Sequence, residues 1–420
     1  MVASIYETYQ ARTTASAAIH SRTQQVVPGG TSRQAGYWSP YPLTIDRGEG
    51  IYLWDIDGHR YLDLINNYTS MVHGHAYPPV LEATKQAIKH STGWAAANKY
   101  QCSLAEQLVE RVPATEQVRF TNSGTESAAL SLNIARTVTG RNKLLMARYG
   151  YHGSLPEFET GSSGNEGPIT YLAGFNNLEE FETILESHGH EIAAVFLEPV
   201  LGSGGVKTAS KAFLLGVEKA ARKAGALLVL DEVLTFRFAP GGSQTEQGLK
   251  PDLTMFGKLI GGGFPVGAVG GEKGLLSVFN PVDMRIFHTG TFNANPVTMA
   301  AGDVSVRELT APRIAHMAKL CSKLRDGLTV LAADCGLPLS ISHHESCLNL
   351  YFSDSAPESS TVREDQEIIT RFHLAALNHG LFLAPRGMMA LSTITTQEHI
   401  DEVLELTSLA MKDVATELQR

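Results

Sequence analysis

Charge, cysteine and long apolar runs are all scarce in this chain of 420 residues. Charged residues make up 18% of it, the net charge is −9, and no long basic stretch occurs. Such a chain is poorly suited to bind nucleic acid or an anionic membrane surface. We therefore expect neither partner, and we expect any anionic ligand to be held by a few local cations.

The four cysteines are widely scattered and show no CxxC spacing, which indicates reduced thiols and a cytoplasmic protein. No apolar run reaches the roughly 18 to 20 residues that a membrane-spanning helix needs. The first 22 residues are rich in Ser, Thr and Ala with Glu7 as their only acid, so a mitochondrial presequence is a minor alternative. The HGH strings at 73–75 and 188–190 lack a metal-ligand pattern, and no metal is expected.

The length predicts a large domain and a smaller one. From about residue 75 to 300, short apolar runs alternate with helical patterns such as 127–138 and 210–225. The expected strands are 118–120, 143–147, 193–199, 226–233, 253–257 and 267–271. Continuous apolar strands separated by helices predict an α/β fold with a mostly parallel sheet covered on both faces.

The two ends of the chain are expected to form the smaller α+β domain. Near the N-terminus we expect extended stretches at 43–45 and 51–54 and a hairpin turn at Asp57-Gly58. Towards the C-terminus, amphipathic patterns predict helices at 313–333, 364–379 and 397–419. The expected division is an N-terminal segment that packs with the small domain, a large domain and a C-terminal small domain, at 1–60, 61–300 and 301–420.

Two reactive groups follow neighbouring apolar runs. LLVLDEV (227–233) delivers Asp231 to the end of a buried strand, and LTMFG (253–257) leads directly into Lys258, with three glycines close behind. In an open α/β sheet the ligand lies beyond the carboxyl ends of the strands. An imine-forming lysine and a carboxylate that keeps a pyridine nitrogen protonated are two requirements of pyridoxal phosphate. The alternatives are a structural salt bridge for Asp231 and a surface location for Lys258.

TNSGTES (121–127) joins a strand to a helix and is the candidate phosphate site. Ser123, Gly124 and Thr125 would offer hydroxyls and backbone N–H groups at the positive end of that helix. The alternative is a plain N-cap in which Ser123 and Glu126 form a capping box.

Further candidates would surround the cofactor ring. In GYHG (150–153), Tyr151 is expected to stack on the ring, with His152 on the side of its phenolic oxygen; a plain core aromatic is the alternative for Tyr151. Glu198 in FLEP is expected to position a neighbour of the ring and not to act as an acid or base. Thr291 in GTFNANP (290–296) is a second phosphate donor, which could come from a partner subunit.

Taken together, these segments resemble the class III aminotransferases of pyridoxal-phosphate fold type I. The chain is most similar to the branch with glutamate-1-semialdehyde aminomutase and the bacterial β-phenylalanine-type aminotransferases. The resemblance rests on VPGGTSR, RFTNSGTES, GYHG, LEPV, LLVLDEV, PDLTMFGKLIGGGFPVGAVGG and HTGTFNANPVTMAAG. It implies a lysine Schiff base with the cofactor and a homodimer in which Thr291 reaches the neighbour's cofactor.

Two arginines bear on the substrate. Arg33, in PGGTSR, matches the arginine that the branch uses for the substrate carboxylate. Arg386, in LAPRGM, matches a second, mobile arginine of the β-amino-acid aminotransferases, where the aminomutases carry a small polar residue. A guanidinium can hold a carboxylate through two hydrogen bonds. The alternative for Arg386 is a surface loop. Phe236 and Trp94 depart from the branch's pattern and leave the donor side chain open.

The sequence thus predicts a pyridoxal-phosphate aminotransferase that moves an amino group from an amino acid, with a β-amino acid favoured, to 2-oxoglutarate or pyruvate in a ping-pong reaction. An aminomutase of the glutamate-1-semialdehyde type is the main alternative, and Arg386 argues against it. A binding protein that keeps the fold without catalysis, and a decarboxylase or lyase, are the others.

Overall fold

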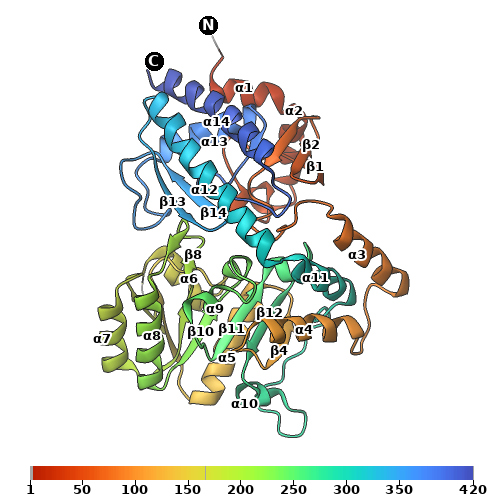
Figure 1. Cartoon of the computed structure of the whole chain (residues 1–420), viewed down its shortest axis with the longest axis vertical. Helices are drawn as coiled ribbons and strands as arrows, with labels where there is room; N and C mark the ends of the chain where they lie inside the picture. Colours follow the sequence, from red (N-terminus) through yellow and green to blue (C-terminus); the bar gives the residue numbers. More distant parts are fainter. Residues whose placement is uncertain (1–2, 166, 420) are drawn as a thin grey trace. The chain divides into compact units, whose positions relative to one another are not determined.

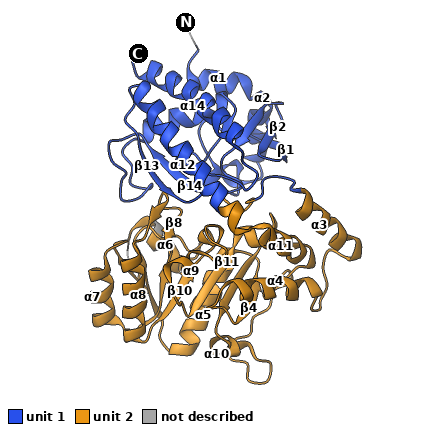
Figure 2. Cartoon of the chain, in the orientation of Figure 1, with its two compact units in different colours: residues 1–68, 73–77, 315–420 blue, residues 69–72, 78–314 orange. Residues whose placement is uncertain are grey.

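The computed structural model describes residues 3–165 and 167–419, and it divides into two compact units (Figure 2). Unit 1 consists of residues 1–68, 73–77 and 315–420, so it combines both ends of the chain. Unit 2 consists of residues 69–72 and 78–314. No helix in the described ranges is long and apolar enough to cross a membrane.

A seven-stranded sheet forms the centre of unit 2 (Figure 1). Its order is β4 (Gln117–Thr121), β12 (Gly267–Gly271), β11 (Leu253–Gly257), β10 (Leu227–Asp231), β7 (Ile192–Leu197), β5 (Lys143–Ala147) and β6 (Thr170–Ala173). The strands from β11 to β6 are parallel, and β12 runs antiparallel to both of its neighbours. The predicted α/β class with a mostly parallel sheet is confirmed.

Helices cover both faces of this sheet because successive strand residues point to opposite sides. Leu144, Phe196 and Val229 pack with α5 (Gly124–Thr139) in one apolar cluster. Leu145 and Val195 pack on the other face with α7 (Leu178–His188) and α8 (Lys211–Ala224). The remaining helices of unit 2 are α3 (Pro78–His90), α4 (Lys99–Arg111), α6 (Pro156–Ser163), α9 (Ser243–Gln247), α10 (Lys273–Leu276) and α11 (Pro296–Glu308).

Unit 1 contains two small sheets and long helices around one apolar core. The sheets are β1 (Ile45–Glu49), β2 (Tyr52–Asp55), β3 (Arg60–Asp63) and β15 (Leu381–Phe382), and β13 (Ser340–His344), β14 (Cys347–Tyr351) and β16 (Met388–Ala390). The helices are α1 (Ile5–Arg12), α2 (Thr14–Thr23), α13 (Gln366–Asn378), α14 (Gln397–Leu418) and most of α12 (Ala311–Asp334). The three helices expected near the C-terminus are confirmed within two residues at each end.

Two local expectations were wrong. The extended stretch placed at 43–45 becomes a strand only from Ile45 onward, where the chain begins to pair with β2. Strand β6 was missed, because the four-residue segment TYLA is too short to give a clear apolar period.

Candidate active site

The register of the central sheet brings three candidate segments to one edge. Asp231 ends β10 and pairs in parallel with Met255 of β11, and Lys258 follows the last residue of β11. Gly267 of β12 pairs with both Gly257 and Thr121. Lys258 and Asn122, each one residue beyond its strand, therefore emerge at the same end of the sheet on either side of β12, and Asp231 lies on the strand next to β11.

Val233 is the common neighbour of these segments. A Cβ added at Gly257 would lie 3.2 Å from its Cγ1, and one added at Gly124 would lie 3.4 Å from its Cγ2. Both glycines therefore let the backbone before Lys258 and the start of α5 approach the residues that follow Asp231.

Asp231 is buried, with 5% of its surface exposed, and it makes two defined contacts. Its Oδ1 accepts from the backbone N–H of Val233 at 2.9 Å, and its Oδ2 lies 2.9 Å from Nδ1 of His152. The ring of His152, which was expected on the side of the phenolic oxygen, contacts the carboxylate that is expected at the ring nitrogen. Nε2 of His152 is buried and has no protein hydrogen-bond partner.

Glu198 follows β7 and is buried beside the same pair. Its Oε2 accepts from the N–H of Tyr151 at 2.9 Å and its Oε1 from the N–H of Gly202 at 3.1 Å. Burial raises the pKa of Glu198 to about 7; His152 opposes this rise electrostatically, and Asp231 adds to it. Glu198 thus fixes the backbone of Tyr151. The Tyr151 side chain is 45% exposed, so it is not a core aromatic.

The candidate phosphate segment begins a helix. Ser123 is the N-cap of α5, and its hydroxyl accepts from the N–H of Glu126 at 3.1 Å. The Glu126 carboxylate accepts from the N–H of Asn122 at 2.8 Å instead of completing a capping box on Ser123. Thr125 is half-buried, and Gly153 (φ +106°) approaches it so closely that a Cβ there would lie 2.6 Å from the Thr125 hydroxyl. The site thus offers a helix N-terminus with two hydroxyls.

Lys258 is half-buried and starts a short 3-10 helix, Lys258–Gly261, with φ of +49°. A left-handed conformation is uncommon for a residue with a Cβ and is found most often where function or packing demands it. Thr291 is exposed, and its loop is linked to the phosphate segment through Asn293, whose Oδ1 accepts from Nδ2 of Asn122 at 2.8 Å. This contact between two asparagines had not been expected from the sequence.

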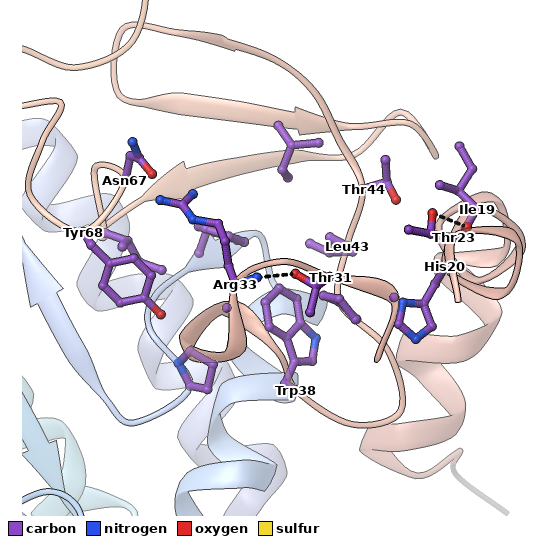
Figure 3. A pocket seen from close by; sticks show the side chains of 17 residues that line it. Ile19, His20, Thr23, Thr31, Arg33, Trp38, Leu43, Thr44, Asn67 and Tyr68 are labelled. Atoms are coloured by element: carbon purple, nitrogen blue, oxygen red, sulfur yellow. Dashed lines mark hydrogen bonds between the residues drawn. The ribbon is translucent and has the colours of Figure 1, made fainter. Parts of the chain in front are cut away.

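Arg33 lines a pocket of about 400 Å³ within unit 1 (Figure 3). The walls include the aromatic side chains of Trp38, Tyr68 and Phe382, and the aliphatic ones of Leu43, Ile45 and Ile65. His20, Thr31, Thr44 and Asn67 add polar groups. The pocket therefore combines one permanent cation with walls that mix aromatic, aliphatic and polar side chains.

Arg386 is half-buried, so it is not the exposed surface-loop arginine of the alternative interpretation. Burial lowers the pKa of its guanidinium, which Tyr68 and Tyr351 partly oppose. Its NH2 group lies 3.2 Å from the sulfur of Met388, and its Nε has no hydrogen-bond partner. No ion pair joins Arg386 to a carboxylate within the described part of the chain. A partly buried cation without a counter-ion suits a site that receives an anion.

Glu232, next to Asp231, is a buried acid that was not among the expected site residues. Its oxygens accept from the Thr235 hydroxyl and from the N–H groups of Ser243 and Gln244, the latter at 2.7 Å. Burial raises its pKa to about 7. Its position inside the apolar run LLVLDEV is the sequence feature that could have indicated a buried acid.

The donor set at the sheet edge fits pyridoxal phosphate. It provides an amine, a buried carboxylate for a ring nitrogen, and a helix N-terminus with hydroxyls for a phosphate. The buried, unpartnered Nε2 of His152 adds a polar atom for which the protein itself supplies no partner.

Comparisons with known proteins agree with this chemistry. The model of the family "Aminotransferase class-III" matches residues 35–411. A β-phenylalanine transaminase of Variovorax paradoxus is 38% identical over 89% of this chain and 87% of its own. A glutamate-1-semialdehyde 2,1-aminomutase of Rhodopirellula baltica is 33% identical over 96% of both chains. A transaminase solved with pyridoxal phosphate bound is 31% identical, covers 97% of this chain and 99% of its own, and has a TM-score of 0.92. The chain therefore belongs to the class III aminotransferases and is a transaminase whose cofactor is pyridoxal phosphate.

Proposed function

We propose that the enzyme transfers the amino group of a β-amino acid with an apolar or aromatic side chain to 2-oxoglutarate or pyruvate in a ping-pong reaction. The observation that supports this donor most is the pocket of Arg33, in which a single guanidinium stands beside aromatic and aliphatic side chains as well as polar ones. Similarity to a β-phenylalanine transaminase supports the same donor class.

Lys258 and Asp231 are the proposed catalytic residues. Pyridoxal phosphate supplies an electron sink for the pair released when the C–H bond beside the amine breaks. Nζ of Lys258 holds the cofactor and then, once displaced by the donor, takes the proton from the amine-bearing carbon. The Asp231 carboxylate keeps a proton on the ring nitrogen, and His152 at 2.9 Å orients that carboxylate.

The remaining site residues have binding roles in this proposal. Ser123, Gly124 and Thr125 bind the phosphate through hydroxyls and N–H groups at the start of α5. Tyr151 stacks on the ring, and Glu198 holds its backbone in place. Arg33 binds the donor carboxylate. Arg386 binds the second carboxylate of 2-oxoglutarate, which would supply the anion that its half-buried guanidinium lacks.

A homodimer in the cytoplasm belongs to the same proposal. Val282, Met284, Phe287 and Phe292 are 94%, 51%, 77% and 69% exposed in the chain alone. Exposed apolar side chains gathered along one segment are typical of a subunit contact. Thr291 lies among them, so a dimer through this segment could bring Thr291 to the partner's phosphate. Four cysteines without a disulfide suit a reducing compartment.

The donor class is tested with a panel of α-, β- and ω-amino acids against 2-oxoglutarate, following the cofactor's absorbance. We expect aromatic β-amino acids to convert the pyridoxal form of the cofactor to its pyridoxamine form fastest. Faster conversion by α-amino acids of equal side-chain size would overturn the proposed donor.

An aminomutase is the lesser alternative, kept because an aminomutase is 33% identical to this chain. An aminomutase converts its substrate without any added keto acid. A transaminase stops after one half-turnover under the same conditions. Sustained turnover of glutamate 1-semialdehyde without keto acid would favour the alternative.

A further inference from the structure

Several hydrogen bonds hold the backbone around Arg386. Arg386 lies in a turn closed by two hydrogen bonds, from the N–H of Gly387 to the carbonyl of Ala384 at 2.8 Å and from the N–H of Ala384 to the carbonyl of Met388 at 3.1 Å. Gly387 has φ of +89°, and a Cβ there would lie 2.9 Å from the carbonyl oxygen of Leu350. The turn is therefore fixed against β14.

A second arginine, Arg363, ties this turn to the strand. Its NH1 donates to the carbonyl oxygen of Arg386 at 2.5 Å, and its NH2 donates to the carbonyl of Leu350 at 3.0 Å. Both carbonyls thus share one rigid, planar donor group.

Asp365 fixes Arg363 in turn. Its two oxygens accept from Nε and NH2 of Arg363, each at 2.6 Å, and the two side chains are 4% and 3% exposed. Asp365 also accepts from the N–H of Phe352 at 2.5 Å. A bidentate pair with extra hydrogen bonds is among the most rigid polar arrangements in a protein. Asp365 carries a single negative charge and pairs with Arg363, so it does not neutralise the positive charge of Arg386 as well.

We infer that the Arg363–Asp365 pair is a positioning element for Arg386 and thereby determines how well the enzyme binds dicarboxylic keto acids. The inference rests on the proposed function, in which Arg386 binds the second carboxylate of 2-oxoglutarate. The pair fixes the backbone from which the guanidinium extends, and the guanidinium itself contacts Tyr68 and the sulfur of Met388. Arg363 and Asp365 do not touch the substrate in this arrangement.

The test uses holoenzyme in its aminated form, mixed with 2-oxoglutarate or with pyruvate while the cofactor's absorbance is followed. Arg363→Leu removes the donor to the Arg386 carbonyl. We expect the half-saturating concentration of 2-oxoglutarate to rise about tenfold or more, because small misplacements of a binding group have large effects. The half-saturating concentration of pyruvate, which has one carboxylate, should change by less than about threefold. The maximal rates with both keto acids should remain similar to those of the wild type. Arg363→Lys, which keeps one donor, should recover part of the loss.

Arg371→Leu is the matched control. Arg371 is another ion-paired arginine of unit 1, bonded to Glu417 at 2.9 Å and to Glu367 at 2.7 Å, with no contact to the turn of Arg386. It should lower thermal stability without changing the preference between the two keto acids. If Arg363→Leu does not fold, Asp365→Asn carries the same expectation. Variants of Arg363 and Asp365 that lose stability but keep the wild-type preference would overturn the inference.

Arg386→Ala separates this inference from the proposed function. If Arg386→Ala keeps the wild-type preference, the proposed role of Arg386 fails. If Arg386→Ala changes the preference while the variants of Arg363 and Asp365 do not, only the positioning role fails.

Discussion

The guanidinium carbon of Arg386 lies 5.5 Å from the centre of the Tyr68 ring. The Tyr68 hydroxyl donates to the carbonyl of Ala35, two residues beyond Arg33. Burial raises the pKa of Tyr68, and the positive charges of Arg386 and Arg33 both oppose that rise. One phenol therefore lies within the electrostatic reach of both Arg33 and Arg386.

Arg386→Ala should weaken the use of 2-oxoglutarate more than the use of an amine donor without a carboxylate. Charge-assisted hydrogen bonds of about 1.5–3 kcal/mol correspond to a roughly tenfold to hundredfold rise in KM. Steady-state kinetics with 2-oxoglutarate, pyruvate and a simple aromatic amine measures this. Arg325→Ala, which removes an exposed arginine paired with Asp326, is the control and should change none of the three. Equal losses for all three substrates would contradict the role of Arg386.

Asp231→Asn should reduce kcat by about a hundredfold or more, because an amide cannot keep the ring nitrogen protonated. Single-turnover absorbance measurements with a saturating donor report this step. The matched control is Asp252→Asn. The Asp252 carboxylate lies at the same sheet and accepts from the N–H of Leu228 at 2.7 Å, and the substitution removes its charge. Similar rates for wild type and Asp231→Asn would show that this carboxylate does not serve the ring.

His373→Phe should remove a pH dependence of stability. His373 is buried, and the centre of its ring lies 4.9 Å from that of Trp38. Neither ring nitrogen has a hydrogen-bond partner among the described residues. Burial lowers the pKa of His373 from 6.5 to about 3. Between pH 6.5 and about pH 3, this histidine is protonated in the unfolded chain and neutral in the folded chain. This histidine therefore costs the wild type about 1.4 kcal/mol per pH unit below 6.5.

Urea titrations of both proteins at pH 8, 6.5 and 5.5 measure the difference. The advantage of His373→Phe over the wild type should grow by roughly 1 kcal/mol from pH 6.5 to 5.5 and stay constant above pH 7.5. An advantage that is the same at all three pH values would contradict the lowered pKa.

Phe287→Asp should weaken the proposed dimer, because it places a charge on the exposed apolar segment beside Thr291. Sedimentation at several concentrations should show more monomer, and activity should fall with the fraction of dimer. Val330→Asp is the control, since Val330 is also exposed, at 60%, but lies on α12. A wild-type enzyme that is fully active as a monomer would exclude a shared site.

The sequence predicted the strands that carry the site because each is an apolar run with clear ends. Strands β5, β11 and β12 begin and end at the expected residues. The direction of β12 could also have been inferred, since the residues between β11 and β12 are too few for a crossover helix. The predicted strand ends were enough to bring Asp231 and Lys258 to one edge.

Tertiary contacts account for what the sequence could not predict. Asn66, Asn67, Tyr68 and Thr69 all have positive φ, between 49° and 74°. That run is fixed by partners far along the chain, such as the bond from Nδ2 of Asn66 to the carbonyl of Ala390 at 2.7 Å. Arg363 donates to the carbonyl of Arg386, 23 positions further along the chain, and no local sequence pattern predicts that contact. The contact between His152 and Asp231 likewise joins distant segments.

The central claim is that Lys258 holds the cofactor, and borohydride reduction of the holoenzyme tests it most directly. Reduction fixes pyridoxal phosphate on the lysine to which it is bonded, and mass spectrometry of the digested protein identifies that residue. We predict the label on the peptide that contains Lys258, and its absence from the Lys258→Ala variant. A label on any other lysine, or an unlabelled wild-type enzyme, would contradict the account.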